Sequence, residues 1–198
     1  MLTCLLEGGG GSGKTALAAT LAIGSEFPFT KLVSAETMVG QSEMAKCQAL
    51  SKVFEDAYKS PLSLIVLDDI ERLLEYVSIG PRFSNVVLQT ILTCVKRTPK
   101  TSKLVVVATT SSAATLEQLE LLDAFNVSFN VPCLAHAEAM AVLREYGVSN
   151  ASEVEPTLRT VSKGIPMKKL MLVVEMSIAE GKSLHPGRFA ATQSLYWP

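Results

Sequence analysis

The sequence predicts an α/β protein in which a parallel β-sheet is covered by helices on both faces and is followed by a small, all-helical domain. Short apolar runs that suit buried strands alternate with segments of helical periodicity from residue 2 to residue 131. After Pro132 the strand patterns stop. We therefore expect an αβα domain over residues 1–132 and a helical domain over residues 133–198.

The composition is that of a folded globular protein. Of the 198 residues, 48% are hydrophobic and 19% are charged, so a large core is expected and disorder is not. The formal net charge is -1 and no long basic run occurs, which argues against nucleic acid as the main partner. No apolar run approaches the ~20 residues that a bilayer-spanning helix needs. The four cysteines form no C-x-x-C pair, so we expect free thiols in a reducing compartment and no zinc site.

The most informative segment is a glycine-rich loop between the first predicted strand, residues 2–6, and a helix that begins at Thr15. The loop consists of Gly8, Gly9, Gly10, Gly11, Ser12, Gly13, Lys14 and Thr15, and it fits the P-loop pattern G-x-x-x-x-G-K-[ST]. Its glycines let backbone N–H groups surround a phosphate, and the following helix N-terminus, with Ala16, adds partial positive charge. A flexible turn would leave the Gly-Lys-Thr ending unexplained. We therefore expect residues 8–16 to bind a nucleotide, with Lys14 on its phosphates and Thr15 on Mg²⁺.

The other elements of the first domain are predicted in order. Apolar runs indicate strands at residues 29–33, 62–67, 104–108 and 127–131, of which the second and third are apolar enough to be covered on both faces. Apolar residues at three- and four-residue steps indicate helices at residues 42–58, 83–95 and 115–122. In the second domain we expect helices at residues 135–146, 155–162 and 167–180, and a weaker one at 188–195.

Two acids follow the strand predicted at residues 62–67. An acid at the end of such a strand lies next to Mg²⁺ in P-loop enzymes, so Asp68 is our metal-site candidate together with Thr15. Capping of a following helix is the alternative role for Asp68. Asp69 is the candidate base that must reach the attacking water. Because Asp is one methylene shorter than the Glu that is usual here in ATP-hydrolysing relatives, we expect slow hydrolysis. Glu71 is interpreted as a solvated charge.

The strand predicted at residues 104–108 ends in Thr109, Thr110 and Ser111. A polar group at this strand tip can orient the attacking water, and Ser111 or Thr110 could do so weakly. Capping of the next helix is an equally good interpretation of the same residues.

With these residues in place, the chain resembles the AAA+ family of ATPases. Residues 40–43, Gly-Gln-Ser-Glu, are similar to that family's GESE segment. Within the family, the chain resembles the second ATPase domain of the N-ethylmaleimide-sensitive, vesicle-fusing ATPases. The matching segments are residues 12–19, 45–48, 56–60, 68–74, 79–85 and 168–172, which cover the chain from the P-loop to about residue 175.

This resemblance implies a sheet of five parallel strands, a helical lid and a homo-hexamer with ATP and Mg²⁺ between subunits. It also implies that the domain binds ATP tightly and holds the ring together, while the first ATPase domain does most of the hydrolysis. The full-length protein is expected to be cytoplasmic, to disassemble SNARE complexes presented by SNAP adaptors, and to meet membranes only indirectly. The adenine-contacting segment normally precedes the first strand, so we expect this chain to be part of a longer protein.

Several positions depart from an active AAA+ pattern. Active members have arginine fingers shortly before the last strand, but residues 119–131 contain no Arg or Lys. Such a finger contributes about 10³–10⁵ in rate in P-loop GTPases, so its absence should slow hydrolysis. The resemblance implies that Lys96 and Lys103, which flank a loop at residues 98–102, approach a neighbour's phosphates. For both lysines, complementing a helix C-terminus is an equally good interpretation. The resemblance also implies that Lys168 senses nucleotide from the lid.

Met38 precedes Val39 and Gly40, where protein-threading members carry an aromatic residue in a central-pore loop. Because Met grips less specifically than an aromatic ring, we expect this domain not to pull substrate. The alternative is a working AAA+ motor that remodels proteins or nucleic acid. Asp69, the missing finger and Met38 all favour an assembly module instead. A degenerate fragment that binds nucleotide poorly and forms no ring is the third interpretation.

Overall fold

The computed structural model describes residues 1–79, 82–97, 102–161, 164–178 and 183–196. Contacts between its residues divide the chain into two compact units. The first unit contains Met1–Gly8 and Lys14–Asn130, and the second contains Gly9–Gly13 and Val131–Pro198. The middle of the glycine-rich loop thus groups with the second unit, whereas Lys14 and Thr15 belong to the first.

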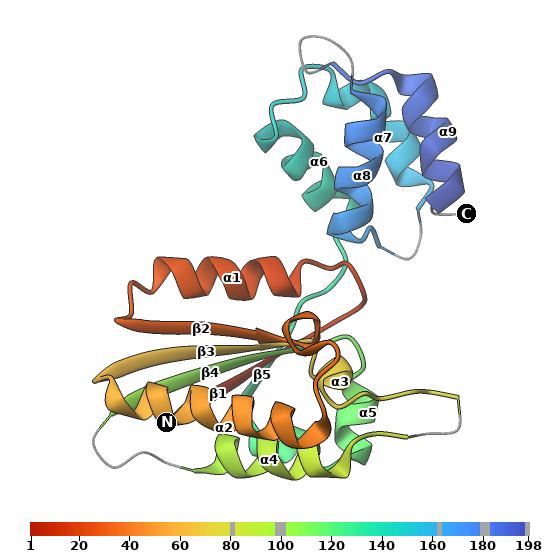
Figure 1. Ribbon diagram of the computed structural model, residues 1–198. Helices are drawn as coiled ribbons and strands as arrows, with labels where there is room; N and C mark the ends of the chain where they lie inside the picture. The colour runs from red at the N-terminus through yellow and green to blue at the C-terminus, as the bar shows by residue number, and fades with distance from the viewer. Residues whose placement is uncertain (80–81, 98–101, 162–163, 179–182, 197–198) are drawn as a thin grey trace. The chain divides into compact units, whose positions relative to one another are not determined.

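The first unit is built on a five-stranded, all-parallel sheet with the strand order β2-β3-β4-β1-β5 (Figure 1). The strands are β1 (Leu2–Glu7), β2 (Phe29–Ser34), β3 (Leu62–Asp68), β4 (Lys103–Thr110) and β5 (Val127–Asn130). The predicted fold class, a parallel sheet of five strands flanked by helices, is therefore confirmed. The carboxyl ends of parallel strands meet at one edge of a sheet, and here that edge carries the loops after β1, β3 and β4.

Helices cover both faces of this sheet. Helix α1 (Lys14–Gly24) lies on one face, and α2 (Glu43–Lys59) and α4 (Asn85–Lys96) lie on the other (Figure 1). Shorter helices are η1 (Ala35–Met38), α3 (Ile70–Leu73), α5 (Ala113–Gln118) and η2 (Leu122–Ala124). The single helix predicted at residues 115–122 is thus wrong: Glu120 has a φ of +55°, which a right-handed helix does not allow.

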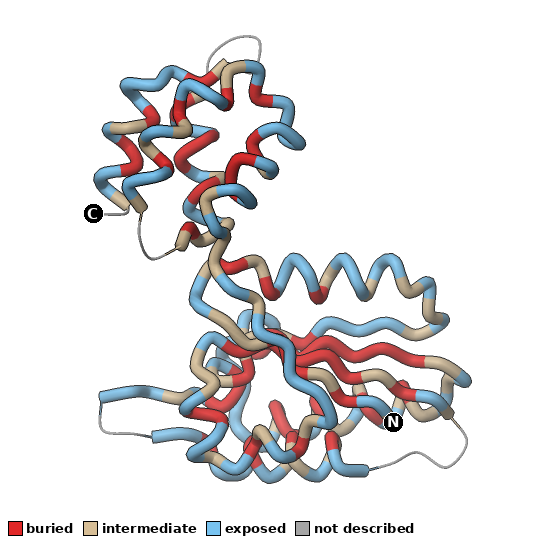
Figure 2. Tube along the Cα trace, turned by 180° about the vertical axis from the view of Figure 1, so that it is seen from behind, coloured by how far each residue is buried: buried red, intermediate tan, exposed pale blue. Residues whose placement is uncertain are grey.

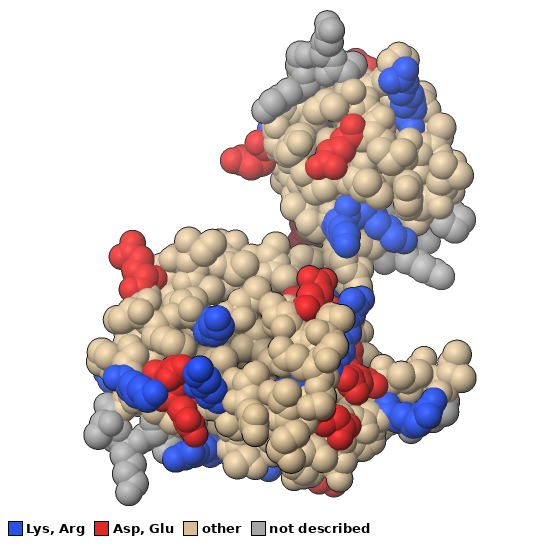
Figure 3. Space-filling view, in the orientation of Figure 1, with Lys and Arg blue, Asp and Glu red and all other residues tan. Residues whose placement is uncertain are grey.

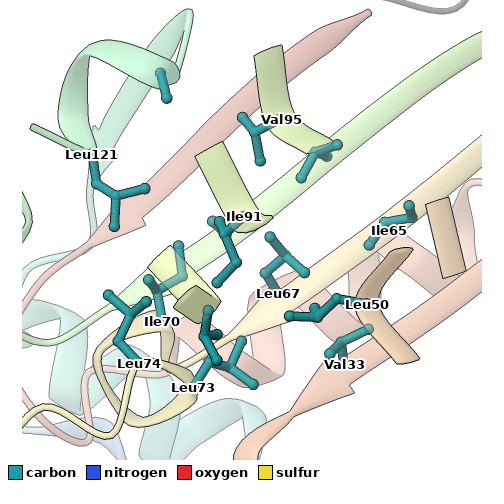
Figure 4. Packing of buried hydrophobic residues seen from close by; sticks show 14 of the residues in the cluster. Val33, Leu50, Ile65, Leu67, Ile70, Leu73, Leu74, Ile91, Val95 and Leu121 are labelled. Atoms are coloured by element: carbon teal, nitrogen blue, oxygen red, sulfur yellow. The ribbon is translucent and has the colours of Figure 1, made fainter. Parts of the chain in front are cut away.

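The core of the first unit lies between the sheet and the pair α2 and α4 (Figure 4). Leu50 of α2, Ile91 of α4 and Ile65 and Leu67 of β3 are at most 1% exposed. The central strands are buried along most of their lengths, as predicted for residues 62–67 and 104–108 (Figure 2). Burial on both faces makes these strands a firm support for the loops at their carboxyl ends.

Met38 also belongs to this core and is only 6% exposed. The Met38 side chain is therefore not presented to solvent as the aromatic residue of a pore loop would be. The 3-10 turn η1 directs its side chain inward, whereas the next residue, Val39, is 81% exposed.

The described residues of the second unit form four helices: α6 (His136–Glu145), α7 (Ala151–Arg159), α8 (Met167–Ser177) and α9 (Pro186–Tyr196). Leu143, Val154, Leu170 and Phe189, one from each helix, are fully buried against one another. Helix α7 begins four residues before its predicted start, so that Pro156 lies inside it. The sequence pattern placed this proline in the first turn, where proline is best tolerated. Across the described ranges, none of the helices has the length and apolar character needed to cross a bilayer.

Candidate phosphate and metal site

The Lys14 side chain is held by the first residue of the glycine-rich loop. Strand β1 leads into the glycine-rich loop, and α1 begins at Lys14 itself. The Lys14 side chain is buried, and its Nζ donates a hydrogen bond to the carbonyl oxygen of Gly8 at 2.9 Å. The ammonium group therefore lies over the start of the loop, where a P-loop lysine can meet a phosphate.

Gly11 and Gly13 are needed for the backbone path of the loop, because both have a positive φ. Gly11 has a φ of +80°, and a Cβ built on it would lie 3.3 Å from Cβ of Lys168 in the same unit. The Lys168 N–H, in the first turn of α8, donates to the Gly11 carbonyl at 2.9 Å. The structure thus brings Lys168 beside a P-loop residue, with its side chain exposed. The neighbouring Lys169 instead donates through Nζ to the Tyr196 carbonyl at 3.0 Å.

Ser12 supplies a donor that no other described residue uses. Its side chain is 7% exposed, and within the described ranges its hydroxyl has no hydrogen-bond partner. A buried hydroxyl is costly to leave unpaired. A phosphate oxygen in the loop would satisfy it, so this residue fits the predicted ligand.

Asp68 joins the P-loop to two strand ends. Its Oδ1 accepts hydrogen bonds from the hydroxyls of Thr15, at 2.9 Å, and Thr109, at 2.8 Å. The side chain therefore does not take the helix-capping role that was its alternative. Thr109 was not predicted as a site residue. Pairing of the two strands would have identified it. Leu67 pairs with Ala108, so the next residue of each strand, Asp68 and Thr109, must also be neighbours.

Asp69, the residue after Asp68, has a left-handed backbone conformation. Its φ and ψ are 50° and 66°, the left-handed region, which costs an L-residue roughly 1 kcal/mol and which Asp tolerates better than most. The Asp69 N–H donates to the Thr109 hydroxyl at 2.8 Å, which fixes this conformation. Its carboxylate lies 3.5 Å from Arg72 Nε. Burial, and then the charges of Asp68 and Glu71, raise the pKa of Asp69.

Glu71 is not the solvated charge that the sequence suggested. Its Oε2 accepts from the Thr110 hydroxyl at 2.9 Å, and its Oε1 accepts from the Ser111 N–H at 2.7 Å. The prediction failed because these partners lie 39 and 40 residues away along the chain.

Ser111 follows the end of β4, and its side chain is exposed. The N-cap of α5 is Ser112, so neither Ser111 nor Thr110 takes the capping position that was their alternative. Ser111 lies at the same sheet edge as Asp69, which is where a water-orienting group would have to be.

The residues at this edge fit a magnesium ion. Thr15 and Asp68 offer a hydroxyl and a carboxylate oxygen, the hard ligands that Mg²⁺ takes together with waters and substrate phosphates. In the described part of the chain no group of three or more His, Cys, Asp and Glu side chains forms a metal cage.

Lys96 and Lys103 lie far from the chain's own P-loop residues. Lys96 ends α4 and Lys103 begins β4, at the amino end of the sheet. Thr110, at the other end of β4, is roughly 23 Å from Lys103 at the rise of an extended strand. Between the two lysines, Arg97 lies over the Tyr58 ring at 5.4 Å, and residues 98–101 are outside the described ranges. Neither lysine can therefore serve the nucleotide site of its own chain.

A protein-family model and several curated proteins match this sequence. The model is described as "ATPase family associated with various cellular activities (AAA)" and covers residues 4–133. A vesicle-fusing ATPase of Arabidopsis thaliana is 50% identical over 184 residues, which is 92% of this chain and 24% of that protein. A vesicle-fusing ATPase of Dictyostelium discoideum is 45% identical over 91% of this chain and 24% of its own length.

A third relative has a similar identity and also matches most of this chain. The vesicular-fusion protein sec18 of Schizosaccharomyces pombe is 45% identical over 162 residues, 81% of this chain and 19% of that protein. The chain thus spans about a quarter or less of the length of these relatives.

Proposed function

The chain belongs to the AAA family of ATPases, and on that premise we propose that it is the second ATPase domain of a vesicle-fusing ATPase. In this proposal it binds ATP and Mg²⁺ tightly, hydrolyses ATP slowly and holds six subunits in a ring. The high identity to vesicle-fusing relatives over most of the chain supports the choice within the family. The full-length protein would then act in the cytoplasm, on SNARE complexes presented by SNAP adaptors.

The observation that carries the proposal is Asp69. A base that activates water must come within hydrogen-bonding distance of it. Asp is one methylene shorter than Glu, and the Asp69 carboxylate already faces Arg72 at 3.5 Å. Residues 119–131 also lack the arginine that would stabilise the transition state from a neighbour. Both features favour binding over turnover.

The chain's own residues divide the work of nucleotide binding. Lys14 and the Ser12 hydroxyl would bind phosphate oxygens, and Thr15 and Asp68 would hold the metal, which supplies charge neutralisation when bound. Asp69 would accept a proton from the attacking water only after turning from Arg72.

Ring assembly through the nucleotide would use the opposite end of the sheet. Lys96 and Lys103 are exposed there and are too far from their own P-loop, so they are available to a neighbouring subunit's phosphates. The viewed face of the sheet unit shows Lys and Arg interspersed with Asp and Glu (Figure 3). Such a surface differs from the basic stripe that is typical of nucleic-acid binding, and so it favours protein partners.

The proposal is tested by measuring mass with light scattering, with and without ATP and Mg²⁺, while phosphate release is followed on the same sample. We expect an ATP-dependent hexamer and slow release. Lys14→Ala is the control, since it removes a buried phosphate-binding ammonium group and should abolish both ATP binding and assembly.

Two results would contradict the proposal. Fast turnover would identify a working motor and overturn the interpretation of Asp69. A monomer under both conditions would show that the chain does not hold a ring by itself.

A further inference from the structure

Four hydrogen bonds join the acidic turn, residues 68–71, to the end of β4. Thr109 uses its hydroxyl to donate to Asp68 and to accept from the Asp69 N–H, both at 2.8 Å. Glu71 accepts the other two, from the Thr110 hydroxyl at 2.9 Å and from the Ser111 N–H at 2.7 Å. The two strand ends that carry the reacting groups are therefore fastened together by side chains.

Both carboxylate oxygens of Glu71 are used in this junction. Hydrogen bonds to a carboxylate are roughly twice as strong as those between neutral groups. The Thr110 hydroxyl also accepts from the Ser112 N–H at 3.1 Å, so its proton is directed toward Glu71. Glu71 is half-buried: its bond from the Thr110 hydroxyl is partly shielded from water, whereas its bond from the Ser111 N–H is exposed.

Glu71 and Asp69 are joined by helix α3. This helix has only four residues, too few to be stable alone, so its position depends on tertiary contacts. The Asp69 carbonyl accepts from the Arg72 and Leu73 N–H groups, which makes Asp69 the first residue of the same turn. A shift of α3 would thus move the Asp69 carboxylate, and the Ser111 end of the junction would shift with it.

We propose that Glu71 is a positioning residue for ATP hydrolysis, which fixes Asp69 and the Ser111 strand tip relative to each other by bonding Thr110 and Ser111. This inference rests on ATP hydrolysis by the domain and is independent of ring formation. A chain that hydrolyses ATP as a monomer would contradict the proposed function but would leave this test intact.

The test compares three variants. Glu71→Ala removes both bonds. Glu71→Gln keeps the shape, because its amide oxygen can accept from Ser111 while its amide N–H donates to the Thr110 oxygen. Glu117→Ala is the matched control, since Glu117 is an exposed acid on α5 at the same sheet edge.

Three quantities are measured for each variant: single-turnover phosphate release, ATP affinity, and hydrogen exchange of the Ser111 amide in the nucleotide-free chain. The Ser111 amide reports the junction directly and needs no nucleotide. Helix α3 carries the buried residues Ile70 and Leu73, so Glu71 variants are expected to fold.

We expect Glu71→Ala to slow release about tenfold, the order expected when a reacting group loses its fixed position, with ATP affinity changed less than twofold. Its Ser111 amide should exchange faster. Glu71→Gln should keep at least half the rate and the slow exchange, and Glu117→Ala should match the unaltered chain. The inference is wrong if Glu71→Ala hydrolyses at the normal rate, or if Glu71→Gln is as slow as Glu71→Ala. The latter outcome would show that the charge of Glu71, and not the contacts it makes, is what matters.

Discussion

At the scale of single residues, the site depends on side chains that hold one another. Asp68 accepts from Thr15 and Thr109, and Thr109 in turn accepts from the Asp69 N–H. Asp69 is thereby kept in the left-handed conformation that places its carboxylate near Arg72. In the proposed function, the length of this one side chain limits how closely its carboxylate can approach the attacking water.

We predict that Asp69→Glu raises the rate of phosphate release by about tenfold or more, because a well-placed general base contributes about 10²–10⁴. Single-turnover phosphate release measures this. Asp69→Asn is the control, because it has the same length but cannot accept a proton. An unchanged rate in the Glu variant would indicate that the missing arginine, and not the short acid, limits hydrolysis.

At the scale of elements, the sheet presents the site and the helices stabilise the sheet. The strands β1, β3 and β4 end at one edge, where they bring together residues that are 40 or more positions apart. Helix α7 of the second unit is stabilised differently, since it keeps Pro156 in its interior. Proline removes a backbone N–H and crowds the preceding turn, so α7 must be held by its buried residues, such as Val154 and Leu158.

We predict that Pro156→Ala stabilises the second unit by about 2 kcal/mol. Alanine favours a helix interior by about 3 kcal/mol over proline, and the greater freedom of the unfolded chain offsets part of this gain. Calorimetric unfolding measures the change.

The matched control for this prediction is Ser152→Ala, which introduces the same residue one helical turn earlier on the same exposed face. It should change stability by only a few tenths of a kcal/mol. A lower unfolding temperature for Pro156→Ala would show that the proline fits the α7 backbone without strain.

At the scale of the whole molecule, the two ends of the sheet have different tasks in the proposed function. The carboxyl end carries the chain's own P-loop residues, and the amino end carries Lys96 and Lys103. A closed ring of identical subunits needs two different surfaces on each subunit. A nucleotide bound at one end and contacted by a neighbour's other end would provide such a pair.

We predict that Lys96→Ala weakens ATP-dependent assembly while the monomer stays folded. Light scattering with ATP and Mg²⁺ measures the mass, and circular dichroism measures folding. Lys59→Ala is the matched control, because Lys59 is also the exposed last residue of a helix, α2, on the same face of the sheet. A ring that persists in Lys96→Ala would contradict the contact with a neighbour's phosphates. Lys96 would then only complement the C-terminal end of α4.

The sequence by itself determined the fold class and the strand–loop–helix that carries the P-loop. These follow from local patterns, namely apolar runs, helical periodicity and a glycine-rich loop ending in Lys14 and Thr15, which depend on neighbouring residues alone. The same local reasoning failed where distant contacts decide. It did not place Met38 in the core, it missed Thr109, and it began α7 at residue 155, with the proline in the first turn.

Only the tertiary structure decided how the acids at the sheet edge are arranged. The sequence predicts a metal ligand at Asp68, a base at Asp69 and a solvated charge at Glu71, but it does not determine which side chains they contact. Which hydroxyl or amide each carboxylate meets depends on the pairing of β3 with β4, because that pairing sets residues 109–111 beside residues 68–71. Strand register is fixed by the burial of whole strands against their helices, a property that no short segment of the chain contains.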